Sequence, residues 1–407
     1  MVKTSLAFAV AVVLAAPPPA RSDPAAAAVT GLSTDTLRLG RYLELTGHGF
    51  LAGADAMTLL HVDGSFEPDD GRPRPVDVEI VPEVLSGTRA RYVVEEFDGP
   101  ARIIDFRGET GWWSVIIRPV SWVAGNRVAG EPFSARLRIG APRQVVHLRY
   151  LPAWRPALTR FGLAAMDRAV RDRILSVVRR DFAGTGVEFR ETVPEDYALY
   201  SAVDIDGRDP NGLGAFGNDA TPGKDVGNAR LHDRVGGWDA RTDADGNPAW
   251  GGIFVESFLD LSPRAAAPSP LASPIFDAIF DRLRPDRGGR PADETDAARP
   301  PAPVLPGGIG CPAAGRDRLV ACAVWTLGGL IGSTVSHEVA HTLGLAEPFG
   351  PADAVHRPGD EPAMLMEAGS ARPFEERAEL AGRAPGRFAA DELAYLAAIL
   401  PPDEEDR

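Results

Sequence analysis

The sequence predicts an α+β protein in two parts: an all-β sandwich in the first third of the chain, then a mixed domain of helices and short strands. Up to about residue 142, apolar and polar side chains alternate over short runs, as half-buried strands require. After Tyr150, apolar positions recur every three or four residues, which is the spacing of an amphipathic helix. A long apolar stretch near the C-terminus then ends in two histidines at helical spacing.

Residues 1–28 have the pattern of a secretory signal peptide. Lys3 supplies the positive start, and Leu6–Ala16 is an apolar run too short to span a bilayer. The small residues and prolines that follow favour cleavage between Ala16 and Ala28. No cysteine follows the run, so a lipid anchor is not expected, and we expect no later segment of membrane-spanning length. We therefore expect export to the periplasm or medium, without membrane insertion.

The composition excludes some partners and suggests an origin. The chain has 407 residues with a formal net charge of −14, which disfavours nucleic acid and anionic membranes as partners. Its length allows two domains with separate cores. Arginine exceeds lysine, and Ala, Pro and Gly are abundant, which suggests a GC-rich bacterial genome.

The predicted sandwich covers residues 30–142 and contains about seven short strands (as an estimate from turn spacing). The runs Val76–Ile80, Trp113–Ile117 and Phe133–Ile139 alternate most regularly. The stretch Leu43–Phe50 resembles the Gly-x-Gly-Phe turn of TIG immunoglobulin-like modules. That resemblance implies an immunoglobulin-like sandwich.

The second predicted domain covers residues 150–400. Its first helix has an apolar face formed by Leu163, Met166, Val170, Ile174 and Val177, with arginines on the solvated face. Later elements are strands near 187–190 and 197–205, a strand at 252–258 expected at the sheet edge, helices at 275–283 and 388–400, and a flexible surface insertion at 285–308. The polar stretch 206–237 offers calcium ligands, with candidates Asp204, Asp206, Asp209 and Asp219. Because it matches no EF-hand spacing, a plain loop is the preferred reading.

The segment from His337 to Gly344 carries the chemistry. His337 and His341 share one helix face, so both imidazoles can hold a single zinc ion. Glu338 lies where it can accept a proton from a water molecule activated by that zinc. The bare His-Glu-x-x-His pattern occurs by chance about once in 10⁴ positions. Its position at the end of an apolar helix, with Gly344 placed to adopt a positive φ, favours the zinc site over two surface histidines.

This segment resembles the signature of the metzincin zinc metallopeptidases, His-Glu-x-x-His-x-x-Gly-x-x-His (or Asp) followed by a methionine turn. The resemblance implies an endopeptidase that hydrolyses peptide bonds in protein or peptide substrates, with Glu338 as general base. Glu347 stands at the eleventh position in place of His or Asp. The run from His356 to Met366 is similar to that of matrixin-like members, so His356 is preferred over Glu347 as third ligand. Met366 is then the methionine of the turn, with Met364 as the alternative.

Two other functions and one covalent link stay open. The chain could be an inactive adhesion or binding protein that retains a peptidase-like zinc domain. The third hypothesis is a closed structural zinc site, which requires both Glu347 and His356 to bind the zinc ion. Cys311 and Cys322 are the only cysteines, and an oxidising compartment favours a disulfide between them over free thiols or metal ligands.

Overall fold

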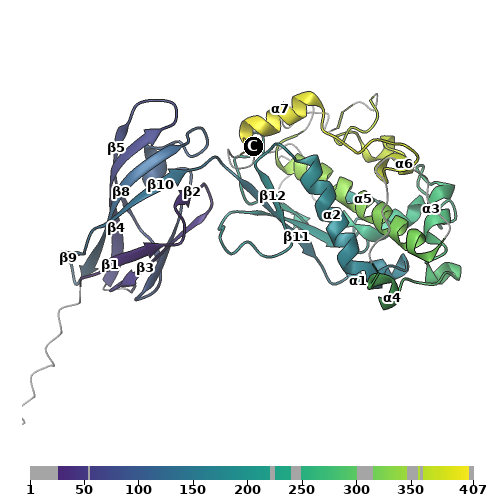
Figure 1. Ribbon diagram of the computed structural model, residues 1–407, viewed down its shortest axis with the longest axis horizontal. Helices are drawn as coiled ribbons and strands as arrows, with labels where there is room; N and C mark the ends of the chain where they lie inside the picture. The colour runs from purple at the N-terminus through teal and green to yellow at the C-terminus, as the bar shows by residue number, and fades with distance from the viewer. Residues whose placement is uncertain are drawn as a thin grey trace, which may run out of the picture.

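The fold is mixed α+β with several sheets, as expected at that level (Figure 1). The computed structural model describes residues 26–53, 56–220, 225–239, 249–299, 315–345, 356–357 and 361–402. Most of the predicted signal peptide, residues 1–25, lies outside them.

The N-terminal part consists of two sheets around one apolar cluster. Leu45, Phe66 and Trp113 lie in that cluster and are at most 2% exposed. Three predicted strands are found with their alternation intact, as β5, β8 and β10. The strands are β1 (Ala28–Leu32), β3 (Tyr42–His48), β7 (Arg89–Val93) and β6 (Glu83–Ser86) in one sheet, and β2 (Thr36–Leu37), β10 (Phe133–Ile139), β8 (Gly111–Val123), β4 (Ala56–Pro68) and β5 (Arg74–Ile80) in the other, with β9 (Asn126–Ala129) beside β8.

The C-terminal sheet has the order β12–β11–β13–β17–β14. Its first four strands run parallel, and β14 pairs with β17 in the antiparallel direction at the end of the order. The bounds are β11 (Gln144–Tyr150), β12 (Val187–Arg190), β13 (Ser201–Asp206), β14 (Gly217–Asn218), β15 (Arg234–Val235), β16 (Gly237–Asp239) and β17 (Ala249–Phe254).

This order corrects one expectation. The segment 252–258 was expected at the edge, but β17 lies between β13 and β14, and a 3-10 helix, η3 (Val255–Leu261), follows it. The short strand β14 is at the edge instead. Strand β11 falls between the predicted domain limits of 142 and 150, and the division into domains itself stays a prediction.

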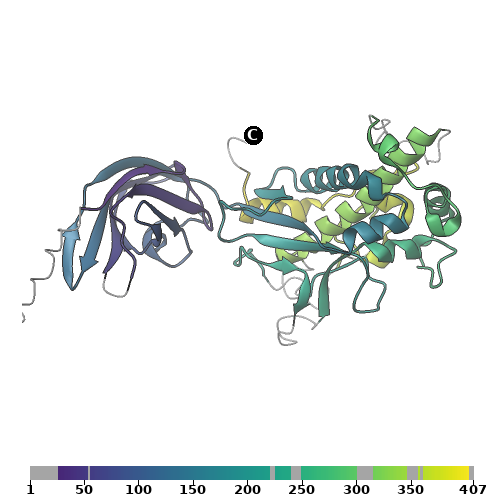
Figure 2. The same ribbon diagram turned by 90° about the horizontal axis from the view of Figure 1, so that it is seen from below.

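Helices α2 and α5 lie together against the C-terminal sheet (Figure 2). Val170, Ile174 and Val177 form the buried face of α2, as expected. The helices are α1 (Trp154–Arg160), α2 (Asp167–Asp181), α3 (Pro274–Phe280), α4 (Glu294–Ala297), α5 (Arg316–Thr342), α6 (Phe374–Arg377) and α7 (Ala390–Ile399), with 3-10 turns η1 (Gly99–Arg102), η2 (Ala164–Met166), η4 (Pro285–Arg287) and η5 (Gly369–Ala371).

The 27-residue helix α5 is the central helix of the C-terminal part. It is long and apolar enough to cross a membrane, so the expectation that no later segment reaches that length is wrong. However, 94% of its apolar window is buried inside the fold, which is what a core helix of a soluble protein requires. The helix is apolar because it contacts α2 and α3 as well as β14, β15 and β17.

Glycines let α5 approach α2 closely. A Cβ atom at Gly332 would lie 2.7 Å from Val177 Cβ and 3.3 Å from the Ile174 carbonyl oxygen, whereas one at Gly329 would meet only ordinary contacts at 3.7 Å and beyond. We predict that Gly332→Ala lowers the free energy of unfolding by about 1–3 kcal/mol through overpacking. Gly329→Ala, the matched control in the same helix, should be neutral or stabilising by up to about 1 kcal/mol. Urea denaturation of both variants checks this, and equal stabilities would contradict the close packing.

One composition-based expectation fails and another stays open. Residues 285–299, expected as a flexible surface insertion, are mostly exposed. They include η4 and α4, where α4 has a capping box and Arg316 pairs with the buried Asp296, and their flexibility stays a prediction. Residues 300–308 lie outside the described ranges. The arginines of α2 are not all solvated, because Arg173 and Arg180 both bind the buried carboxylate of Glu379.

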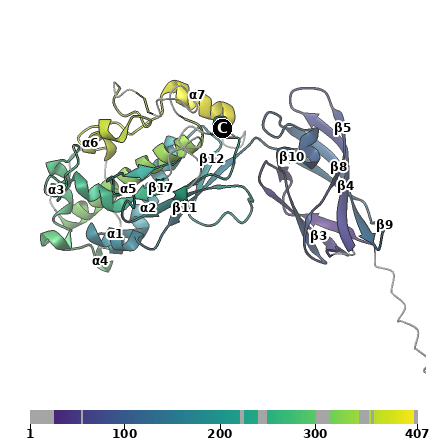
Figure 3. The same ribbon diagram turned by 180° about the vertical axis from the view of Figure 1, so that it is seen from behind.

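The two parts lie side by side (Figure 3), and main-chain and side-chain hydrogen bonds join them. Tyr42 N donates to Asp196 O at 2.9 Å, and Ala198 N donates to Gly40 O at 2.8 Å. Arg107 from the N-terminal part donates to Asn228 O and Ala229 O at 2.9 and 2.7 Å. These bonds join the N-terminal sheets to loops of the C-terminal part.

Candidate metal centre

Helix α5 brings His337 and His341 together one turn apart, as their spacing predicts. Their Nε2 atoms are 3.2 Å apart and their ring centroids 4.6 Å apart. The helix ends at Thr342, and Gly344 follows with a φ of +90°, the positive value expected for it. This turn brings the Leu345 carbonyl back to His341 Nδ1, at 2.9 Å. The glycine therefore orients one of the two imidazoles as well as ending the helix.

Backbone carbonyls determine the tautomers of both rings. His337 Nδ1 is 2.6 Å from Leu365 O, and His341 Nδ1 is 2.9 Å from Leu345 O. A carbonyl only accepts hydrogen bonds, so each Nδ1 carries the hydrogen and each neutral ring leaves its Nε2 lone pair free. Two lone pairs facing each other at 3.2 Å repel unless a cation lies between them. The donor set therefore fits a metal ion.

His356 completes the group. Its Nε2 is 3.2 Å from His337 Nε2, and one nitrogen from each of the three rings lies within 4.8 Å of the others. The next residue, Arg357, is held by two contacts, and these fix the position of His356. Arg357 N donates to Met366 O at 2.9 Å, and the Arg357 side chain pairs with Asp391 on α7. The other candidate, Glu347, lies outside the described residues.

The spacing and the protonation of the group suit zinc. Ligand atoms about 2.0–2.1 Å from a tetrahedral zinc ion stand about 3.3 Å apart, close to the two separations seen here. Burial lowers the pKa of His337 well below its usual value, with the charges of His341 and His356 acting in the same direction. Burial also lowers the pKa of His341 to about 4 and lowers that of His356. All three rings are thus neutral at pH 7, which is the ligand form.

Glu338 lies beside the histidines and is 6% exposed. Its Oε2 accepts a hydrogen bond from Asp219 N at 2.8 Å, just beyond edge strand β14. Burial, together with the negative charge of Asp219, raises the pKa of Glu338 to about 8. A metal cation bound by the histidines would lower the pKa of Glu338, because an opposite charge favours the carboxylate.

Both methionine candidates for the expected turn are buried. Met364 and Met366 are each 2% exposed, and Ala363 adopts a φ of +62° that reverses the chain before them. Leu365, the residue between the two methionines, makes the polar contact with the site. Its backbone carbonyl accepts a hydrogen bond from His337 Nδ1 and so orients that ring. The choice of Met366 over Met364 stays a prediction, since neither is placed against a metal.

A cleft of about 300 Å³ opens beside His337, Glu338 and His356. One wall is the segment Gly214–Gly217, which leads into and includes the first residue of edge strand β14. The other lining residues are 269–271, Thr334 on α5, Gly369, Ser370, Arg372 and Arg377 on α6. The site therefore has room for a substrate between the edge strand and the segment after the methionine turn.

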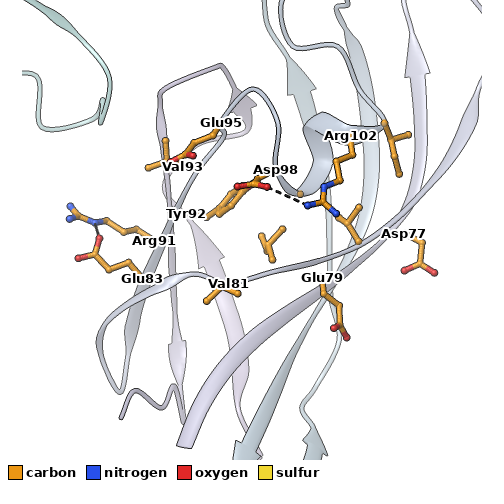
Figure 4. A pocket seen from close by; sticks show the side chains of 14 residues that line it. Asp77, Glu79, Val81, Glu83, Arg91, Tyr92, Val93, Glu95, Asp98 and Arg102 are labelled. Carbon is orange, nitrogen blue, oxygen red and sulfur yellow. Dashed lines mark hydrogen bonds and ion pairs between the residues drawn. The ribbon is translucent and has the colours of Figure 1, made fainter. Parts of the chain in front are cut away.

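A larger hollow lies in the N-terminal part. It measures about 770 Å³ and lies between β5 and β7 in the N-terminal sheets (Figure 4). Asp77, Glu79, Glu83, Glu95 and Asp98 line it, and Arg102 pairs with Asp98. The candidate ligands His337 and His356 line the smaller cleft together with Glu338, so that cleft is the candidate metal centre.

Other sequence candidates do not form a site in the described residues. Asp204 pairs with Arg149 and Arg234, Asp206 accepts from Ala153 N, and Asp209 accepts from three loop amides. The three histidines are the one group among the described residues that could hold a metal ion. The stretch 206–237, expected as a plain loop, contains the short strands β14 and β15. Cys322 is buried on α5 and Cys311 lies outside the described residues, so their disulfide stays a prediction.

Sequence reasoning missed Gly217, and it named Asp219 only as a calcium candidate, without its contact with Glu338. A Cβ atom at Gly217 would lie 2.6 Å from Glu338 Oε1 and 2.7 Å from Thr334 Cγ2. We predict that Gly217→Ala displaces the Glu338 side chain and lowers kcat/KM for the peptide cleavage that the sequence resemblance implies by about 10²-fold, while metal content is unchanged. Gly329→Ala, which adds the same methyl group without a clash, is the control. Full activity in Gly217→Ala would show that Glu338 tolerates displacement.

Comparison of the chain with protein-family models, with curated proteins and with solved structures gives no match.

Proposed function

We propose that this protein is an exported zinc-dependent endopeptidase. The observation that carries the proposal is the convergence of three imidazole nitrogens beside a buried glutamate, in a cleft bounded by an edge strand. Zinc is the ion proposed because three histidines at this spacing suit its tetrahedral geometry and leave one position open.

His337, His341 and His356 would hold the ion. A zinc ion bound there would supply Lewis acidity toward a peptide carbonyl and toward water. Glu338 is held by Asp219 N through one oxygen, which leaves its other oxygen beside Gly217 and the cleft. From that position Glu338 can accept a proton from the attacking water and return it to the leaving amine.

The edge strand supports an extended peptide as substrate. Strand β14 ends the order of the C-terminal sheet and runs antiparallel to β17, directly beside Glu338. A peptide laid along this strand would form main-chain hydrogen bonds with it, which places a scissile bond near the histidines for many side-chain sequences.

The test is metal analysis together with cleavage of unfolded protein and peptide libraries. The mature protein should contain about one zinc per chain. Cleavage should stop with a chelator and return when zinc is added. Stoichiometric zinc without any cleavage would favour the alternative of a binding protein with an inactive peptidase-like domain. Protein without a transition metal, after incubation with zinc, would contradict the proposal.

A further inference from the structure

Arg377 is a buried cation in the wall of the cleft. It is 5% exposed, yet no carboxylate of the described residues forms an ion pair with it. Other buried arginines are paired: Arg372 with Glu376, and Arg284 with Asp286. The carboxylates of Glu376 and Glu338 favour its charge through space, but neither is in direct contact with it. A buried guanidinium without a directly bound carboxylate is costly, so its retention in a cleft suggests that an anion from outside completes it.

Two backbone carbonyls orient the Arg377 guanidinium. Its Nε donates to Arg372 O at 3.2 Å, and its Nη2 donates to Gly369 O at 2.9 Å. These bonds leave Nη1 without a hydrogen-bond partner among the described residues. Because Arg377 lines the cleft, the Nη1 donors are available to a group that enters it. The guanidinium is thus fixed before any ligand binds.

The surroundings make Arg377 a strong binder of negative charge. Its guanidinium lies 5.3 Å from the ring centroid of Phe216, which stacks on Phe258. Burial, with the charge of Arg372 in addition, lowers the pKa of Arg377 to about 9, so the group is still charged at pH 7 but poorly solvated. In such a site a charge-assisted hydrogen bond is stronger than in water.

The position of Arg377 relates it to the reacting bond. Phe216 adjoins Gly217, whose Cα faces Glu338 Oε1, and all of these residues line one cleft with His337. A ligand bound in this cleft can therefore contact Arg377 while it lies beside the histidines.

We propose that Arg377 is a specificity-determining residue that binds a carboxylate of the substrate beside the scissile bond. This inference rests on the proposed function. The carboxylate could belong to an Asp or Glu side chain, in which case the enzyme cleaves next to acidic residues. It could instead be the terminal carboxylate, in which case the enzyme removes residues from the C-terminus.

A binding experiment separates this inference from the proposed function. The zinc-loaded Glu338→Gln variant of the full chain is titrated calorimetrically with peptides that differ only in Glu or Gln at one position, each with a free or an amidated C-terminus. We expect the carboxylate to tighten binding about 10- to 100-fold. A preference for Glu in amidated peptides identifies the side chain, and a preference for the free C-terminus identifies the terminal group. Equal affinities for all four peptides would overturn the inference without bearing on catalysis.

Substitution of Arg377 assigns the preference to this residue. Arg377→Gln in the same background should remove the preference for the carboxylate, and Arg377→Lys should keep part of it. Arg383→Gln, an equal charge change at an exposed position, is the control. Circular dichroism and zinc content report whether each variant folds. If Arg377→Gln does not fold, the peptide comparison in the Glu338→Gln protein still decides whether the cleft prefers a carboxylate. A preference that survives in folded Arg377→Gln would overturn the assignment.

Discussion

Glu338→Gln is expected to lower kcat/KM for peptide cleavage by about 10²- to 10⁴-fold, the contribution of a general base. The amide oxygen of glutamine can still accept the hydrogen bond that Asp219 N donates to Glu338 Oε2. Its size matches that of glutamate, so the histidines should keep their positions. What is lost is the ability to take up a proton. Zinc content should therefore be the same in the variant and the parent.

Steady-state kinetics on an amidated and a free peptide, with zinc measured on the same samples, checks this prediction. Glu361→Gln is the matched control, because Glu361 is an exposed carboxylate near the methionine turn. Its activity should equal that of the parent. A Glu338→Gln variant that retains full activity would remove Glu338 from the proton transfer, and one that loses zinc would show that the substitution acts on the metal centre instead.

Local spacing explains what could be predicted from the sequence. His337 and His341 face one another because a helix repeats every 3.6 residues, and this depends on no other part of the chain. Gly344 has its positive φ because the helix must end there. Strand β10 begins and ends at the predicted residues, since its alternation is complete over Phe133–Ile139.

Pairing between residues far apart in the sequence explains which features could not be predicted from it. The apolar pattern of β17 does not differ from that of other strands. Only the order of the sheet shows that β17 lies between β13 and β14 and that β14 is at the edge. The pairing of Arg180 with Glu379 joins residues 199 positions apart, and no periodicity in α2 reveals it. The same holds for Gly217 and Asp219, which contact Glu338 across the fold. The two candidate metal ligands on one helix were thus predictable, whereas the walls of the cleft were not.

His356→Ala is expected to weaken zinc binding by more than the 10- to 100-fold that loss of an outer-shell partner usually costs, because it removes a ligand itself. The nitrogen of His356 lies 3.2 Å from that of His337, a separation suited to a shared ion. Glu347→Ala is the comparison variant, since Glu347 is the other candidate for third ligand and should leave affinity unchanged.

Competition with a chromophoric chelator gives both affinities, and thermal melting gives an independent measure. Zinc at 100 times its Kd stabilises the folded protein by about 2.7 kcal/mol, so His356→Ala should lose most of the zinc-dependent rise in Tm. The reverse result, in which Glu347→Ala loses zinc and His356→Ala keeps it, would exchange the two ligands. Loss in both variants would mean four protein ligands and no open position for water, and hence a structural ion instead of a catalytic one. The identity of the third ligand therefore decides whether this centre can catalyse hydrolysis.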